Sequence, residues 1–216
     1  MKRLGSLLLI ALIALGVASL PAFADTAFSD LGDPPSYNCC SGWTVGGQNS
    51  IVGLVRDANQ FTSLTSGQVT QIDVGLGWVT GTNAATISLW TSVGDLPGSM
   101  LGTWDVSNQP NFGSTSNILT TISVGPGISL TAGDQYFLVV EGAIDTWDAW
   151  NLNSQGVTGL LLQDSGNGWN MFPGNTLGAF DVLTSPGGGV PEPASLFLLG
   201  SGLAGLAGVA RKRMKK

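Results

Sequence analysis

The chain has 216 residues, of which 43% are hydrophobic, and a formal net charge of −6. It contains no histidine, which excludes a Ser-His-Asp triad, a Cys-His catalytic pair and any histidine-ligated zinc or copper site. Seven tryptophans and a low share of charged residues favour a folded, exported β-domain over a disordered chain.

The first 24 residues have the pattern of a signal peptide. Lys2 and Arg3 form a short basic start, residues 4–20 are uncharged and mostly apolar, and Ala22 and Ala24 occupy the two positions that signal peptidase recognises. We expect cleavage after Ala24, with export across the inner membrane. The alternative is a permanent membrane helix that begins at residue 4.

Residues 25–47 are rich in Gly, Pro, Ser and Asn, and this composition predicts an irregular lead-in. The segment holds both cysteines of the chain, Cys39 and Cys40, which are adjacent in sequence. Two cysteines are too few for a four-cysteine metal site. In an oxidising compartment they form a strained vicinal disulfide, pair between molecules or stay free.

Residues 48–183 alternate short apolar segments with turn residues, which predicts an all-β fold: an antiparallel two-sheet sandwich or jelly roll. In the clearest segment, residues 68–80, alternation places Ile72, Val74, Leu76 and Trp78 on one buried face. Residues 136–140 are apolar on both faces, as in a central strand between two layers. The predicted strands are residues 51–55, 68–80, 86–91, 101–106, 120–124, 135–140, 149–152, 160–163 and 179–183. The residues predicted to be buried are Ile72, Val74, Leu76, Phe137, Val139 and Leu161.

A Gly-rich linker is predicted at residues 184–189.

The predicted body is strongly acidic. Residues 25–189 contain one basic residue, Arg56, against thirteen acidic residues, a net charge of −12. Nucleic acid and anionic membrane surfaces are therefore excluded as partners.

Carboxylates offer the one catalytic possibility that composition leaves open. Glu141, Asp145 and Asp148 lie close in sequence, and glycoside hydrolases use two carboxylates. A hydrolase also needs an apolar pocket that keeps one carboxyl protonated, and the sequence shows none, so we predict no enzyme activity.

Calcium is a second option for the acidic and amide side chains, because their oxygens suit this ion. The candidate ligands are Asp145, Asp148, Asn151 and Asn153, or Asp164 with Asn167. Their spacing matches no known calcium loop, so we predict no metal and no cofactor.

Tryptophan side chains suggest a sugar-binding surface. Trp147 and Trp150 are embedded in acidic and amide residues, a combination suited to stacking on a neutral glycan. The pair shares a face only if residues 145–150 lie at a strand entrance, because successive strand positions point to opposite faces. The alternative is that both indoles fill the core. Trp90 is predicted on the face opposite Ile87 and Leu89.

The last residues combine three features in order. Pro191-Glu192-Pro193 is followed by the uncharged residues 194–210, and the chain ends in a basic cluster, Arg211, Lys212, Arg213, Lys215 and Lys216. A helix of this length spans about 26 Å, just short of the roughly 30 Å of a bilayer core. The basic cluster stays on the cytoplasmic side, which places the body outside the inner membrane.

Residues 190–216 resemble the PEP-CTERM sorting signal of exosortase-processed bacterial proteins. The resemblance implies that an exosortase-like enzyme cuts near Pro191-Glu192-Pro193 and that the body moves to the cell surface or the extracellular matrix. Similar tails are also known as an "ice-binding protein C-terminal" domain. The motifs Asp-Val-Gly-Leu-Gly-Trp (73–78) and Leu-Thr-Ala-Gly-Asp-Gln-Tyr-Phe-Leu-Val (130–139) resemble choice-of-anchor β-sandwich modules over about residues 61–183, which implies no catalytic residues.

The sequence thus predicts a non-enzymatic, exported surface or matrix protein. Its partners are signal peptidase and an exosortase-like enzyme, and the tail holds it transiently in the membrane. One alternative is a carbohydrate-binding module for neutral extracellular polysaccharide. Another is a structural or adhesive component of the matrix that binds no small ligand.

Overall fold

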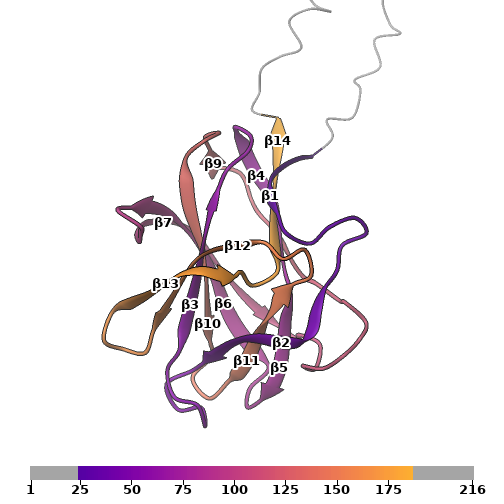
Figure 1. Cartoon of the computed structure of the whole chain (residues 1–216), viewed down its shortest axis with the longest axis vertical. Coiled ribbons are helices and arrows are strands. Elements are labelled where there is room, and N and C mark those ends of the chain that lie inside the picture. The colour runs from indigo at the N-terminus through magenta and orange to yellow at the C-terminus, as the bar shows by residue number, and fades with distance from the viewer. Residues whose placement is uncertain (1–23, 187–216) are drawn as a thin grey trace, which may run out of the picture.

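Alternating apolar and polar residues fold the middle of the chain into strands (Figure 1). The computed structural model describes residues 24–186, which contain fourteen strands and no helix. The strands are β1 (Asp25–Ser29), β2 (Tyr37–Gly46), β3 (Arg56–Thr62), β4 (Gly67–Val74), β5 (Leu76–Thr80), β6 (Ala84–Val93), β7 (Leu96–Ser107), β8 (Thr120–Ser123), β9 (Ser129–Leu130), β10 (Gln135–Gly142), β11 (Trp147–Asn153), β12 (Thr158–Asp164), β13 (Trp169–Thr176) and β14 (Phe180–Pro186).

The strands form three antiparallel sheets, which confirms the all-β prediction and differs from the predicted two sheets. A five-stranded sheet has the order β1-β14-β4-β8, with β9 also paired to β4. A six-stranded sheet has the order β13-β12-β3-β10-β6-β7, and a three-stranded sheet has the order β2-β11-β5. The predicted strand 68–80 is divided between two of these sheets as β4 and β5, with Gly75 between them.

Gly75 is the point where the five-stranded and three-stranded sheets join. Its N–H donates to the carbonyl of Ala179 at 2.9 Å, and its carbonyl accepts the N–H of Asn151 at 2.9 Å. The N–H of Ala179 in turn donates to the carbonyl of Asn151 at 2.7 Å. A Cβ at position 75 would approach the Ala179 side chain to 3.1 Å and the Tyr37 ring to 3.2 Å, so glycine fits this junction best.

The main core contains side chains from all three sheets. Ile72, Val74 and Phe180 come from the five-stranded sheet, Leu138 comes from the six-stranded sheet, and Trp150 comes from the three-stranded sheet. The six-stranded sheet therefore packs against a layer made by the other two sheets. Burying this apolar surface is the main force that holds the layers together.

The predicted buried residues are confirmed: Ile72, Val74, Leu76, Phe137, Val139 and Leu161 are all buried. Phe137 and Val139 belong to a second cluster with Ala58 and Leu162, separate from the main core. The second cluster explains why β10 is apolar on both faces.

The prediction that Trp78 lies on the buried face with Ile72, Val74 and Leu76 is wrong. The side chain of Trp78 is only half-buried, and its indole N–H donates to the carbonyl of Gly81 at 3.1 Å. The predicted strand 51–55 is also wrong, since these residues lie in turns and loop before β3.

Residues 25–47 are not the predicted irregular lead-in, because they contain β1 and β2. Phe28 of β1 stacks on Phe180 with ring centroids 4.6 Å apart, so an aromatic contact holds β1 against β14. The predicted linker is also shorter than expected, because β14 extends to Pro186 and Thr184 is buried. Asp25 pairs with Thr184, so the predicted mature N-terminus lies beside the strand that leaves the body (Figure 1).

The predicted leader up to residue 23, and the tail 190–216 with its apolar segment 194–210, lie outside the described residues. Within residues 24–186 no helix is long and apolar enough to cross a membrane.

Trp150→Ala tests the core between the three sheets. It opens a cavity and removes a buried hydrogen bond, so we expect the free energy of unfolding to fall by about 3–5 kcal/mol in urea titrations followed by circular dichroism. Trp147→Ala is the matched control on the same strand and is expected to cost less than half as much. Equal losses for the two variants would contradict this account of the core.

Candidate functional site

The two tryptophans predicted to bind glycan have different environments. Trp150 is fully buried, its indole N–H donates to the carbonyl of Ala179 at 3.0 Å, and its ring packs against Phe180. The ring lies so close to Gly178 that a Cβ there would come within 2.6 Å of it. Trp150 is thus a core residue, and its predicted role in stacking on a glycan is wrong. Trp147 is half-buried at the first position of β11.

The calcium candidates near these tryptophans are not assembled into a site. Asp145 is exposed and accepts the N–H of Thr82 at 3.3 Å, whereas Asp148 is fully buried. The amides of Asn151 and Asn153 donate to the carbonyls of Gly75 and Leu177. No group of three or more His, Cys, Asp or Glu side chains that could hold a metal occurs in residues 24–186.

Asp164, from the other calcium candidate pair, has protein partners of its own. It forms an ion pair with the guanidinium of Arg56 and accepts the N–H groups of Gly166 and Gly168 at 2.7 and 3.0 Å. Arg56 also lies over the ring of Trp169, 5.5 Å from the ring centroid. The carboxylate of Asp164 is therefore already bound by Arg56 and by two backbone N–H groups.

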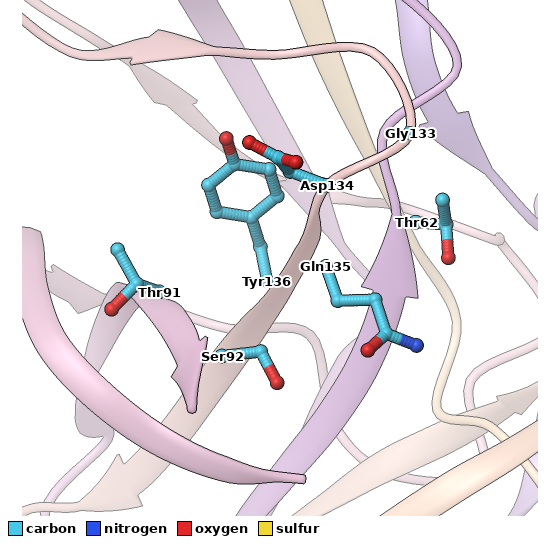
Figure 2. A pocket seen from close by; sticks show the side chains of 7 residues that line it. All are labelled: Thr62, Thr91, Ser92, Gly133, Asp134, Gln135 and Tyr136. Atoms are coloured by element: carbon cyan, nitrogen blue, oxygen red, sulfur yellow. The ribbon is translucent and has the colours of Figure 1, made fainter. Parts of the chain in front are cut away.

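An open pocket of about 540 Å³ lies at one end of the six-stranded sheet (Figure 2). Three neighbouring strands form it: Thr62 ends β3, Thr91 and Ser92 lie near the end of β6, and Gln135 begins β10. Asp134 and Gly133 complete one side from the turn before β10, and Tyr136 follows Gln135. Gly133 has a φ of 86°, a left-handed conformation that favours glycine and allows this turn.

The groups that line the pocket are almost all neutral hydrogen-bonding groups. The lining side chains carry four hydroxyl groups, from Thr62, Thr91, Ser92 and Tyr136, together with the Gln135 amide and one carboxylate, Asp134 (Figure 2). Gln60 extends this polar surface, since its amide N–H groups donate to Ser92 at 3.1 Å and to Asp95 at 3.2 Å. Asp134 is the only carboxylate among the lining residues, so the pocket holds no carboxylate pair of the kind that glycosidases use.

Trp90 immediately precedes Thr91 and Ser92 of the pocket. The prediction that it faces away from Ile87 and Leu89 is confirmed, because those two lie in the main core while Trp90 packs against the second cluster. Its indole N–H donates to the hydroxyl of Ser88 at 2.7 Å. The sequence predicted the position of this tryptophan correctly but not the pocket, because the pocket is formed by strands that are distant in sequence.

Four buried aspartates of the body have pKa values well above the usual value of an aspartate. Burial raises the pKa of Asp57 and of Asp30 to about 8, against a usual value of 3.8. Burial also raises the pKa of Asp148 and of Asp181 to about 7, and the neighbouring Asp73 adds to the shift of Asp181. Neither carboxyl oxygen of Asp148 has a hydrogen-bond partner within residues 24–186, so the neutral acid is the favoured form there.

Comparison with known families identifies the C-terminal end of the chain. Residues 189–213 match the PEP-CTERM protein-sorting motif. The chain carries an exosortase sorting motif. This confirms the resemblance of the tail, and the motif indicates export and exosortase-dependent sorting to the cell surface. No curated protein and no solved structure matches the chain. The "ice-binding protein C-terminal" and choice-of-anchor resemblances stay predictions.

The strand that precedes this motif, β14, is paired with a neighbouring strand on each side. β14 ends at Pro186, just before the motif begins at residue 189, and it is hydrogen-bonded to β1 on one side and β4 on the other. The motif therefore follows directly from an internal strand of the body.

The buried aspartates predict that stability falls as the pH rises. The folded state keeps their protons up to pH 7–8, whereas in the unfolded chain they titrate near 3.8. Their contribution is thus complete below about pH 4 and is lost as the pH rises through 7–8. Asp145 acts in the opposite sense, because hydrogen bonds from Thr82 lower its pKa. Its contribution to stability is therefore lost when the pH falls below the usual range of a carboxyl group. We expect maximum stability near pH 4 and a decline up to about pH 8 in denaturant titrations.

Asp148→Asn isolates one of these groups, because asparagine resembles the neutral acid. We expect the loss of stability between pH 5 and pH 8.5 to shrink by about 2 kcal/mol in this variant. Asp145→Asn, at an exposed position just before β11 and with a lowered pKa, should leave the loss above pH 5 unchanged. A pH profile of Asp148→Asn identical to that of the parent would show that Asp148 ionises freely in the folded protein.

Proposed function

We propose that this protein is a non-enzymatic component of the cell surface or extracellular matrix, delivered there by two proteolytic steps. Signal peptidase removes residues 1–24 during export, and an exosortase cuts near Pro191-Glu192-Pro193. Between these events residues 194–210 hold the chain in the membrane, with Arg211 to Lys216 on the cytoplasmic side. The observation that carries the proposal is the sorting motif at residues 189–213.

The chemistry of the body supports a role without catalysis. The chain has no histidine, so the commonest general base is unavailable. The aspartates with raised pKa are buried, away from the pocket, where no substrate reaches them. A general acid must lie within hydrogen-bond reach of its substrate, which these groups do not.

The geometry of the chain ends supports removal of the tail from the folded body. Asp25 and Thr184 are cross-strand partners, so the proposed mature N-terminus lies beside the strand that leads to the exosortase site. Pro191 and Pro193 lack the backbone donor that a helix needs and disfavour helix at the residues before them. Such a sequence suits a processing site, because proteases cut most readily outside packed helices and strands.

Mass spectrometry of the protein recovered from the cell surface tests this proposal. We expect a mature form that begins at Asp25 and lacks the cluster from Arg211 to Lys216. Replacing Pro191, Glu192 and Pro193 together by alanine should leave the tail attached and the protein in the inner-membrane fraction. A surface form of the parent that still carries Lys216 would instead establish a permanent tail anchor.

A second candidate function, binding of neutral glycan, rests on the pocket at the end of the six-stranded sheet. Its hydroxyl, amide and carboxylate groups are the partners that sugar hydroxyls need, and Trp90 adjoins it in sequence. The acidic body repels acidic polymers, which restricts the ligand to neutral polysaccharides. The volume of about 540 Å³ is in the range of small-ligand pockets.

Affinity electrophoresis in gels that contain neutral glucans, mannans or galactans tests this second function. If one of them retards the full chain, Gln135→Ala and Ser92→Ala should each weaken the retardation about tenfold. Trp147→Ala, at a position outside the pocket, should leave it unchanged. Normal mobility of the parent protein in all gels would exclude glycan binding and favour a structural component without a small ligand.

A further inference from the structure

Cys39 and Cys40 lie in a bulge of β2. Gly42 pairs with Asn151 of β11, and the next residue of β11, Leu152, pairs with Asn38. Cys39, Cys40 and Ser41 are therefore left without partners on β11. In a regular strand, adjacent side chains point to opposite faces and two neighbouring thiols are kept apart. The bulge removes this restriction.

The two sulfur atoms are in contact. The Sγ atoms of the two free cysteines are 2.7 Å apart, longer than the roughly 2.05 Å of a disulfide bond but near enough that a small movement would close it. Cys39 is half-buried beside Leu31, Tyr37 and Ala179, and its carbonyl accepts the N–H of Gly113 at 3.1 Å. Cys40 is exposed, and β2 is at the edge of its sheet. One thiol is thus fixed by packing while the other is open to solvent.

We propose that Cys39 and Cys40 form a vicinal disulfide after export, and that this bond protects the surface protein from cross-linking through its exposed thiol. The proposal is independent of glycan binding and requires only the oxidising exterior to which the sorting motif directs the body. An exposed lone thiol in that compartment forms disulfides between molecules. An adjacent cysteine in contact competes with that reaction because its effective concentration is far higher.

The oxidant in this reaction is a disulfide, either on an exported thiol–disulfide exchange protein or on a small molecule. The Cys40 thiolate attacks one sulfur of the oxidant, forms a mixed disulfide and releases the first thiol of the oxidant. The Cys39 thiolate then attacks the Cys40 sulfur, closes the ring and releases the second thiol. The protein loses two hydrogens and two electrons, and the oxidant gains them. Adjacent Cα atoms are about 3.8 Å apart, less than in ordinary disulfides, so the bond is strained and easily reduced.

Thiol counting on the protein recovered from the cell surface tests whether the bond forms. The sample is quenched in acid, unfolded and treated with N-ethylmaleimide before or after reduction. We expect no label before reduction and two labels after it, with the unlabelled monomer about 2 Da lighter than the dithiol form. Two labels on the unreduced monomer, or a parent protein that runs mainly as a reducible dimer, would overturn the proposal.

Single-cysteine variants test the protective role. Under the same oxidant, Cys39→Ser leaves only the exposed thiol and should raise the fraction of disulfide-linked dimer about tenfold on non-reducing gels. Cys40→Ser retains the half-buried thiol and should give less dimer, and the double variant should give none. A Cys39→Ser protein that remains monomeric would refute protection, even where the parent forms the bond.

Discussion

The junction at Gly75 is the constraint on which the rest of the structure depends. Its N–H and carbonyl connect the segment before β14 with the middle of β11, and any side chain there would press on Ala179 and Tyr37. Next to it the indole of Trp150 fills the space above Gly178 and donates to the carbonyl of Ala179. One side chain thus supplies both the apolar volume and the hydrogen bond at the point where the sheets meet. The two smaller sheets thereby act as a single layer against the six-stranded sheet.

This junction also connects the core to sorting. The indole of Trp150 donates to the carbonyl of Ala179, and Ala179 immediately precedes β14, which ends three residues before the sorting motif begins. β1 covers the outer side of β14 and starts at Asp25. The proposed mature N-terminus is therefore part of the same sheet as the strand that precedes the sorting motif. Pairing with β1 and β4 makes β14 an internal strand.

The sequence predicted the parts of the fold in which alternation is strong. The faces of β4, β6 and β10 follow directly from their apolar patterns, and so does the position of Trp90. β3 was missed because the residues that it buries include Asp57 and Asn59, so its sequence is polar although both side chains are fully buried. Trp150 was misplaced because its neighbours Asp148 and Asn151 are polar for the same reason. The pocket was not predictable from local pattern, since Thr62, Thr91 and Gln135 meet only through pairing of strands distant in sequence.

Hydrogen–deuterium exchange of individual amides tests most directly whether the Gly75 junction unites the sheets. If it does, the amides of Gly75, Asn151 and Ala179 open only with the whole body and exchange as slowly as that of Leu138 in the centre of β10. Exchange of these three amides at the rate of an exposed turn residue such as Gly94 would contradict the account, because it would mean that the three-stranded sheet opens independently of the core.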